Sequence, residues 1–381
     1  MDLVIPNATD EIGVGIIGTG MMGKCHSLAF NAVKATFGNV PHPRLELLCD
    51  VEEQHVKEKA SELGFARHTT DWRSLVTDPD IQIVSITTPN SCHPEMAIAA
   101  LEAGKHVYCE KPMALTLEDA EAMTAAAREA IGLTLLGYGF TKNPTVLHAK
   151  RLIEAGTIGR VFDFRGAIDE DYVADSQLPW TWRLNKGSAG LGSLGDLMCH
   201  LVSLAHMLLG PILEVSGLME TVHKTRPVLG EPQRQQAVEN DDIAHAIVRF
   251  ETGVAGVISS SRIAHGRKNG IRIEIHGSQG MIAFDQERMN ELQLYTADGS
   301  REISGFRTIL TGPQHWPYGL FCPMPGHSLG YNELKVIEVA HFLRAICGLE
   351  KPFPNFEDGL RIERVIHSFP RTAQKRSWVT V

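Results

Sequence analysis

The sequence lacks three features that would direct it to a membrane, to nucleic acid or to an oxidising compartment. Its N-terminus has no basic segment, and no window approaches the roughly 20 apolar residues of a membrane span. Lys and Arg number 36 against 45 Asp and Glu, a formal charge of −9, and no basic run could neutralise a row of phosphates. The seven cysteines are odd in number and scattered, so neither disulfides nor zinc are expected. We therefore expect a reduced, cytoplasmic protein that binds neither nucleic acid nor a membrane.

The length of 381 residues favours two domains, and 43% hydrophobic with 21% charged residues is typical of a globular protein. The first part alternates short apolar runs with segments of helical period. Such alternation predicts a parallel sheet with right-handed crossovers. We expect strands at residues 12–17, 45–49, 81–87, 105–109 and 133–138, with helices at 22–33, 52–63, 94–103 and 117–130.

From about residue 160 the pattern changes to longer runs that alternate apolar and polar positions, which indicates a mostly antiparallel, open-faced sheet in an α+β domain. The expected strands are 161–168, 214–222, 243–250, 254–261, 271–276 and 292–295. We expect one apolar helix at 194–209, a long ordered loop at 311–330 and another helix at 331–348. We therefore place an α/β dinucleotide-binding domain at 1–138 and a domain for substrate binding and oligomerisation at 139–381, with the C-terminal helix packing back on the first.

The first predicted strand runs into a glycine-rich segment that opens a helix. Its residues follow the order G-x-G-x-x-G: Gly18, Thr19, Gly20, Met21, Met22 and Gly23. Gly18 permits a tight turn, Gly20 lets the backbone approach a pyrophosphate and Gly23 allows close packing of helix on strand. The pattern alone can arise by chance in a chain with 35 glycines, but its place between a buried strand and a helix predicts a Rossmann-type dinucleotide site.

An acid ends the second predicted strand. The Asp50 carboxylate can accept hydrogen bonds from the 2′-OH of an adenosine ribose and would repel a 2′-phosphate, so NAD is favoured over NADP. Its spacing from the glycines exceeds the usual roughly 20 residues, because residues 34–43 look like an insertion before the strand. The alternative is that Asp50 only caps the next helix.

Three further motifs follow predicted strands or lie on the apolar helix. They are Thr-Pro-Asn-Ser-Cys-His at 88–93, Cys-Glu-Lys-Pro at 109–112 and Gly-Asp-Leu-Met-Cys-His at 195–200. With the glycines they resemble the glucose-fructose oxidoreductase, inositol dehydrogenase and rhizopine-catabolism (Gfo/Idh/MocA) family. The resemblance covers nearly the whole chain. Residues 178–183 and 305–338 look most like the family's levoglucosan and other sugar or polyol dehydrogenases.

The resemblance implies a catalytic set of Lys111, Asp196 and His200 that oxidises a secondary hydroxyl of a cyclic polyol, sugar or anhydrosugar with NAD. Such a reaction needs a base, a positive group beside the developing alkoxide and rigid placement of the carbinol carbon. His200 matches the family's general base, and an imidazole suits that task near neutral pH. Lys111 lies at the carboxyl edge of the sheet, where ligands bind in such folds. Asp196, at i,i+4 from His200, shares its helix face and would orient the base.

The same resemblance implies further contacts. Around the nicotinamide and its ribose it places Thr88, Pro89, Asn90, His93, Glu110, Lys111, Trp180 and Arg183. Substrate contacts are assigned to Lys111, Tyr138, Asp169, Arg183, Asp196 and His200. Asp169 is included because the acidic segment that it begins could bind the hydroxyls of a polyol. Where many relatives carry something like Asn-Tyr-Arg after the strand at 133–138, this chain has Gly139-Phe140-Thr141. Polar substrate contacts from that loop are therefore reduced or relocated.

Each assignment has a structural alternative. A Lys before Pro at a strand end is usually a solvated charge. An Asp early in a helix often only interacts with the helix N-terminus, and a single His in an apolar helix is usually a core residue. Residues 88–93 are also typical of a Pro-Asn turn, and the acidic segment 169–171 of an exposed loop. Trp180 and Arg183 fit a packing residue and a surface residue. Asp196 and His200 are also metal-ligand types, but no further ligands are apparent, so no metal is expected.

Two other functions fit the same fold. A glycoside-cleaving relative would use tightly held NAD in a redox-neutral cycle, and a regulator would bind the dinucleotide without turnover. The complete set of Lys111, Asp196 and His200 favours the dehydrogenase. The broad C-terminal sheet has no evident second layer, so its open apolar face predicts association, and the resemblance implies a homodimer or homotetramer.

Overall fold

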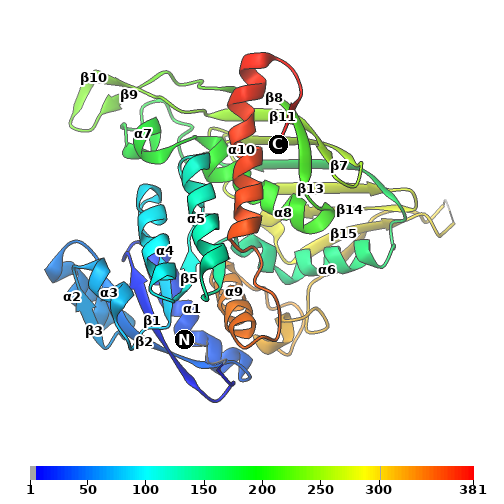
Figure 1. Cartoon of the computed structure of the whole chain (residues 1–381). Helices are drawn as coiled ribbons and strands as arrows, with labels where there is room; N and C mark the ends of the chain where they lie inside the picture. Colours follow the sequence, from blue (N-terminus) through cyan, green and yellow to red (C-terminus); the bar gives the residue numbers. More distant parts are fainter. Residues whose placement is uncertain (1–5, 301) are drawn as a thin grey trace. The chain divides into compact units, whose positions relative to one another are not determined.

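The computed structural model describes residues 6–300 and 302–381, and the chain forms two compact units. The first comprises Met1–Lys142 together with Leu329–Leu360, and the second comprises Asn143–Ser328 with Arg361–Val381. The sequence predicted a second domain at 139–381 whose C-terminal helix packs back on the first, and the structure groups Leu329–Leu360 with the first unit. Figure 1 shows the helices and strands of both units.

The first unit is built on a parallel sheet with the strand order β3-β2-β1-β4-β5-β6. Its strands are β1 (Glu11–Ile17), β2 (His42–Cys49), β3 (Arg67–Thr69), β4 (Ile83–Ile86), β5 (His106–Cys109) and β6 (Thr134–Leu136). Strands β4 and β5 are buried throughout, as expected for a sheet covered by helices on both faces. The order reverses between β1 and β4, and open sheets of this kind bind ligands beyond the carboxyl ends of the strands at such a point.

Helices connect these strands: α1 (Met21–Phe37), α2 (Glu53–Leu63), α3 (Trp72–Thr77), η1 (Asn90–Cys92), α4 (His93–Glu102), α5 (Leu117–Glu129) and η2 (Gly139–Lys142). Helix α9 (Tyr331–Ile346), from the later segment, packs against α1. Residues 34–43, which look like an insertion in the sequence, comprise the end of α1, which continues to Phe37, and the start of β2 at His42. The sequence analysis missed β3 and α3, which are too short to show a period.

The second unit carries a sheet with the order β16-β15-β14-β13-β7-β12-β11-β8-β17. Its strands are β7 (Val161–Asp169), β8 (Ile212–Glu220), β11 (Ile243–Phe250), β12 (Ala255–Ser261), β13 (Gly270–Gly277), β14 (Gly280–Asp285), β15 (Glu291–Thr296), β16 (Arg307–Leu310) and β17 (Val379–Thr380). Strands β7 and β12 pair in parallel and the other neighbours antiparallel, as the alternating pattern predicted. A separate hairpin, β9 (Thr225–Val228) and β10 (Glu231–Ala237), was missed because β10 is exposed along its whole length and has no apolar alternation.

Helices cover one face of this sheet. The helices and turns of the unit are α6 (Pro144–Glu154), η3 (Trp182–Leu184), α7 (Lys186–Ala189), η4 (Leu194–Met198), α8 (Cys199–Leu209), η5 (Gln286–Arg288) and η6 (Tyr318–Leu320), and α10 (Phe356–Lys375) continues into it from the first unit. Helix α8 contacts β7 and α6 contacts β15. In β11 the side chains alternate, with Ala246 and Val248 buried and Ile247 exposed. The core therefore lies between the helices and one face, and the other face is open.

The predicted helix at 194–209 is apolar enough to raise the question of a membrane. The stretch Lys186–Leu209 meets the length and composition of a membrane span, although the sequence analysis found no window approaching one. However, 83% of its most apolar window is buried inside the structure. Its apolar side chains therefore serve as core of the second unit.

Candidate active site

The glycine-rich loop joins β1 to α1 and leaves its backbone open. Gly18 has a φ of 102°, in the region that favours glycine, and its amide donates to the Cys49 carbonyl at 2.8 Å. A Cβ on Gly23 would collide with the Gly18 carbonyl oxygen, whereas a Cβ on Gly20 meets nothing within 4 Å. Gly20 also N-caps α1 without a side-chain hydrogen bond, and the first helical turn has no acidic residue. Helix N–H donors that no side chain caps fit the pyrophosphate of a dinucleotide.

Asp50 borders this loop. Its Oδ2 accepts hydrogen bonds from the Thr19 amide at 2.8 Å and from the Thr19 hydroxyl, and its Oδ1 accepts from the Val51 amide at 2.7 Å. Helix α2 begins at Glu53 with Glu52 as its N-cap, so Asp50 does not cap it. Burial opposes ionisation, but the hydrogen bonds prevail and hold the pKa of Asp50 below its usual value. That this carboxylate selects a ribose 2′-OH stays a prediction.

His93 ties the motif after β4 to the motif after β5. Its ring is fully buried, with Nδ1 3.0 Å from the Pro112 carbonyl oxygen and Nε2 3.1 Å from the Thr88 carbonyl oxygen. Burial lowers the pKa of His93, and a neutral ring donates to one of these carbonyls. The side chain of His93 therefore joins two loops, while Pro89 is exposed and Thr88 and Asn90 are half-buried.

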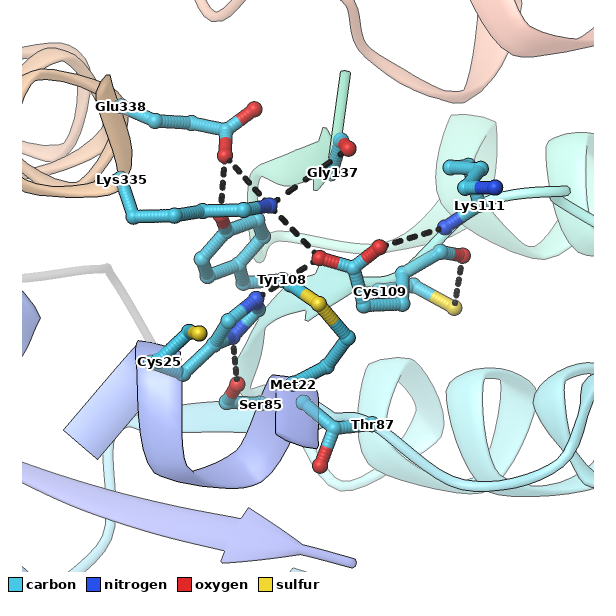
Figure 2. Close-up of polar contacts among 12 residues, drawn as sticks. Met22, Cys25, Ser85, Thr87, Tyr108, Cys109, Lys111, Gly137, Lys335 and Glu338 are labelled. Atoms are coloured by element: carbon cyan, nitrogen blue, oxygen red, sulfur yellow. Dashed lines mark hydrogen bonds and ion pairs between the residues drawn. The ribbon is translucent and has the colours of Figure 1, made fainter. Parts of the chain in front are cut away.

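Glu110 and Lys111 follow β5, and Figure 2 shows the surroundings of Lys111. The buried Glu110 accepts at Oε1 from Lys335 Nζ at 2.6 Å and interacts there with His26 Nε2 at 2.8 Å. Its Oε2 accepts from the Lys111 backbone amide at 3.2 Å. Lys335 lies on α9, and its ammonium also donates to Glu338 at 2.9 Å. The sequence analysis placed Glu110 beside the cofactor; in the structure both carboxylate oxygens bond to protein groups.

The protonation states in this cluster follow from its contacts. Burial alone would raise the pKa of the Glu110 carboxyl, but the Lys335 ammonium and the His26 hydrogen bond hold it well below its usual range. Burial would lower the pKa of Lys335, but Glu110 and Glu338 raise it well above its usual value. Burial lowers the pKa of His26, so its ring is neutral. Because a carboxylate only accepts, His26 Nε2 carries the proton, and Nδ1 accepts from the Ser85 hydroxyl at 2.7 Å.

In the second unit, the two predicted catalytic residues occupy the start of one apolar helix. Asp196 lies in the π-helical turn η4 and His200 in the first turn of α8, and both are half-buried. The Tyr172 hydroxyl donates to Asp196 Oδ2 at 3.0 Å. The helix therefore carries both side chains, and their catalytic roles stay a prediction. It begins with a wider turn than expected, and such turns are frequent at functional sites.

Asp241 holds the start of this helix from a segment before β11. Its carboxylate is 1% exposed, with Oδ1 accepting from the Gly192 amide at 2.8 Å. Its Oδ2 accepts from the Leu194 amide at 2.9 Å and from the Ser193 hydroxyl at 2.7 Å. Three donors that precede Asp196 thus share one buried carboxylate. The sequence analysis did not identify Asp241, because nothing local relates it to a helix more than 40 residues earlier.

The acidic segment after β7 mostly has structural partners. Asp169, predicted to bind substrate, pairs with Arg272 on β13, and Asp171 pairs with Lys268 at 2.8 Å. Tyr172, next to these acids, reaches the predicted catalytic residue Asp196. A loop has no period to mark such a residue, so its only signal was its position next to the acids.

Trp180 precedes the short helix η3, which contains Arg183, and is bonded to the β9–β10 hairpin. The Trp180 amide donates to the Pro227 carbonyl at 2.8 Å, and the indole N–H donates to the Ala237 carbonyl at 3.0 Å. The exposed Arg183 guanidinium lies over the Trp182 ring, 4.6 Å from its centroid. Both polar groups of Trp180 therefore fix its own loop to the hairpin, and cofactor or substrate contacts by this loop stay a prediction.

Two expectations concern Tyr138 and a metal. Tyr138, predicted to bind substrate, is fully buried, so a ligand would reach its ring only after a local rearrangement. Within residues 6–300 and 302–381, no group of three or more His, Cys, Asp or Glu is arranged to hold a metal ion. None of the seven cysteines, which all lie among the described residues, forms a disulfide.

Comparison with known proteins establishes the family. Residues 12–138 match the oxidoreductase family with an NAD-binding Rossmann fold, and residues 146–283 match the GFO/IDH/MocA C-terminal domain. The chain is 39% identical to the levoglucosan dehydrogenase of Pseudarthrobacter phenanthrenivorans, over 97% of this chain and 98% of that protein. The chain belongs to the Gfo/Idh/MocA family. It is also 30% identical to the scyllo-inositol 2-dehydrogenase (NAD(+)) of Bacillus subtilis, over 90% of this chain and 88% of that protein.

Solved structures agree with this assignment. Levoglucosan dehydrogenase in complex with NADH and L-sorbose matches with a TM-score of 0.94 at 39% identity, over 98% of this chain and 99% of that one. An NAD binding oxidoreductase from Klebsiella pneumoniae matches with a TM-score of 0.94 at 40% identity, over 97% and 99% of the two chains. The predicted fold class is confirmed, and this Gfo/Idh/MocA protein is an oxidoreductase with an NAD-binding Rossmann domain.

Proposed function

We propose that this Gfo/Idh/MocA protein is an NAD-dependent dehydrogenase that oxidises a secondary hydroxyl of a cyclic anhydrosugar, sugar or polyol. The observation that carries the proposal is the likeness to levoglucosan dehydrogenase along nearly the full chain, 39% identity over 97% of its residues. An inositol dehydrogenase matches at 30%, so anhydrosugars are the first candidates and inositols the second.

The proposal assigns each catalytic residue a proton or a charge. His200 takes the hydroxyl proton as general base, and Asp196 accepts a hydrogen bond from a neighbouring hydroxyl and orients the base. Lys111 places an ammonium beside the developing alkoxide. Bound NAD supplies the hydride acceptor. Tyr172 joins this set through its hydrogen bond of 3.0 Å to Asp196.

The cofactor is assigned to the first unit. The loop from Gly18 to Gly23 would hold the pyrophosphate against the uncapped start of α1, and Asp50 would hold the adenosine ribose and disfavour NADP. The remaining predicted contacts to the nicotinamide half are Thr88, Pro89, Asn90, His93, Trp180 and Arg183. In this scheme Glu110 acts through the backbone of Lys111.

The test is a substrate screen with the purified protein. It is incubated with NAD and separately with NADP, against levoglucosan and other anhydrosugars, inositols, aldoses and glycosides, and reduced cofactor is followed. We expect NADH to accumulate with at least one anhydrosugar and NADPH to form more slowly. Stoichiometric, non-exchanging NAD with glycoside cleavage and no net NADH would instead support the redox-neutral enzyme. Binding of NAD without turnover on the whole panel would support the regulator.

We also propose that the protein acts in the cytoplasm as a homodimer or homotetramer, associated through the open face of its large sheet. On that face Ile247 and Val257 are direct neighbours in register and are 47% and 48% exposed, and Leu218 is 52% exposed. Contiguous apolar surface of this kind marks association sites. Light scattering should show an oligomer that Ile247→Asp dissociates; a monomeric wild type would contradict the proposal.

A further inference from the structure

We propose that Lys335 and Glu110 are positioning residues for the reaction: helix α9 delivers Lys335, Lys335 fixes the Glu110 carboxylate, and Glu110 fixes the backbone at Lys111. The inference rests on the proposed function, which gives Lys111 its catalytic role. The link is a chain of direct contacts, from Lys335 Nζ to Glu110 Oε1 at 2.6 Å and from the Lys111 amide to Glu110 Oε2 at 3.2 Å. Figure 2 shows Lys335 reaching from its helix toward the strand end where Lys111 begins.

The ammonium of Lys335 is itself held in place. It donates to Glu338, one helical turn along α9, at 2.9 Å, and to the Tyr108 hydroxyl oxygen at 3.3 Å. The Tyr108 hydroxyl donates in turn to Glu338. Lys335 is 1% exposed and Glu338 is 0% exposed. A lysine side chain that is normally flexible is therefore fixed by the Glu338 carboxylate and the Tyr108 hydroxyl, so it can act as a rigid support for Glu110.

Space for the Glu110 carboxylate exists because residue 137 is glycine. A Cβ at Gly137 would lie 2.5 Å from Glu110 Oε1 and 2.8 Å from Oε2. The carboxylate cannot move aside freely, since each oxygen already accepts a hydrogen bond. Gly137 has no left-handed backbone conformation, so alanine is compatible with its φ. Gly137→Ala would therefore displace the carboxylate without removing any charge.

A carboxylate is also the only common group that satisfies the donors around it. Oε1 faces the Lys335 ammonium and His26 Nε2–H, and Oε2 faces the Lys111 amide. In Glu110→Gln, either orientation of the amide would aim its NH2 at one of these donors. The Gln side chain has almost the same shape as Glu but loses the hydrogen bond either to the Lys335 and His26 donors or to the Lys111 amide.

Stability alone does not account for these buried charges. Replacing a buried ion pair by well-packed apolar residues is often neutral or stabilising, because burial costs both ions their hydration. Here the charges converge on the turn between β5 and Pro112, where the predicted catalytic lysine begins. Precise placement of a reacting group is worth a large factor in rate, since a misplacement of about 1 Å can cost about 100-fold.

The test compares three variants of the link with one matched control. Lys335→Met, Gly137→Ala and Glu110→Gln break it at different points. Val339→Ala removes buried volume from the same helix without touching the cluster, since Val339 is 0% exposed and makes none of the polar contacts of Lys335. The readouts are amide hydrogen exchange of residues 109–113, NADH affinity by fluorescence, and kcat and KM on the preferred sugar.

We expect each link variant to speed exchange at the Lys111 amide by about tenfold and to lower kcat by about tenfold or more, with NADH affinity and sugar KM changed less than about threefold. Val339→Ala should leave exchange at this amide and kcat within about twofold. Unchanged exchange and kcat in both Lys335→Met and Gly137→Ala would overturn the inference, as would equal effects in Val339→Ala. If the wild type oxidises no sugar, the proposed function fails, while exchange at Lys111 still decides whether Lys335 and Glu110 fix its backbone.

Discussion

The two units hold their predicted catalytic residues by different means. In the first, Lys111 follows a turn whose backbone bonds to Glu110, and Glu110 depends on the buried cation of Lys335. In the second, the helix with Asp196 and His200 starts from three donors that share the carboxylate of Asp241. One arrangement joins charged side chains from distant segments, and the other joins one carboxylate to two backbone amides and one hydroxyl at the start of the helix.

The difference teaches what each device can tolerate. A buried cluster of charges is stable when complete, but the loss of one member leaves a buried ion without its partner. A carboxylate that accepts from N–H and O–H groups strands only neutral donors when it is lost. The support of Lys111 in the first unit should therefore respond steeply to substitution, and the support of the helix in the second unit more mildly. Four predictions test that contrast.

The largest effect is expected for Lys335→Met. The substitution leaves the buried Glu110 and Glu338 without their cation, which costs about 3–5 kcal/mol in the free energy of unfolding. Urea denaturation at neutral pH measures the loss. Adding Glu338→Gln should recover part of it, since one stranded carboxylate is removed. A loss below about 1 kcal/mol in the single variant would remove the basis of the comparison.

Asp241→Ala is expected to come second. It leaves the Gly192 and Leu194 amides and the Ser193 hydroxyl without their acceptor, which costs about 1–3 kcal/mol for buried unsatisfied groups. Asp241→Asn keeps an acceptor oxygen and should lose less. Parallel urea curves for the two variants and wild type test the order. A larger loss than in Lys335→Met would reverse the proposed contrast.

The pH dependence of stability is the third test. Burial lowers the pKa of His26, so the unfolded chain binds a proton more readily than the native ring does. The free energy of unfolding therefore decreases as the pH falls below the unfolded pKa of about 6.5. Glu110 adds in the same direction: its lowered pKa gives stabilisation that is present above about pH 4.3 and is lost as pH falls further. One proton corresponds to about 1.4 kcal/mol per pH unit.

The matched variant is His26→Gln, which can still donate to Glu110 and accept from Ser85 but does not titrate. Denaturation between about pH 7 and 5 should show a shallower slope for this variant than for wild type. Equal slopes would mean that His26 does not contribute to the acid sensitivity of the first unit.

The smallest effect is expected for Tyr172→Phe. It removes one hydrogen bond to the half-buried Asp196 and should cost about 0.5–1.5 kcal/mol or less in stability. Catalysis should suffer more than stability, with kcat/KM lowered by up to about tenfold, because Asp196 loses its fixed orientation. Steady-state kinetics with the preferred sugar measure this. Unchanged kcat/KM would mean that Tyr172 does not position Asp196 for catalysis.

The regular parts of the fold were predictable because a half-buried helix or strand repeats apolar residues at a fixed spacing. Strand β11, with buried Ala246 and Val248 flanking exposed Ile247, shows the alternation that predicted an antiparallel sheet. The loop from Gly18 to Gly23 was predictable because steric contact demands glycine at two of its positions. The hairpin β9–β10 was not, since polar and exposed residues leave no pattern.

The predicted catalytic motifs could be found in the sequence, but the residues that hold them in place, Lys335 and Asp241, could not. Lys335 bonds to Glu110 across 225 residues, and Asp241 reaches back 49 residues to Gly192. Neither contact has a local spacing, since the fold alone brings the partners together. The contacts of Glu110 were unpredictable for the same reason. Its motif predicted a place beside the cofactor, whereas its carboxylate bonds to Lys335 and to the Lys111 backbone.

The most direct test of the central claim is the rate of NADH formation from the preferred sugar by wild type, Lys111→Ala and His200→Ala, each confirmed as folded and able to bind NADH. The account predicts that each variant loses about 100-fold or more in kcat, because the base and the cation beside the alkoxide both act in the transition state. If both variants keep kcat within about threefold of wild type, Lys111 and His200 are not the catalytic residues, and the account is contradicted.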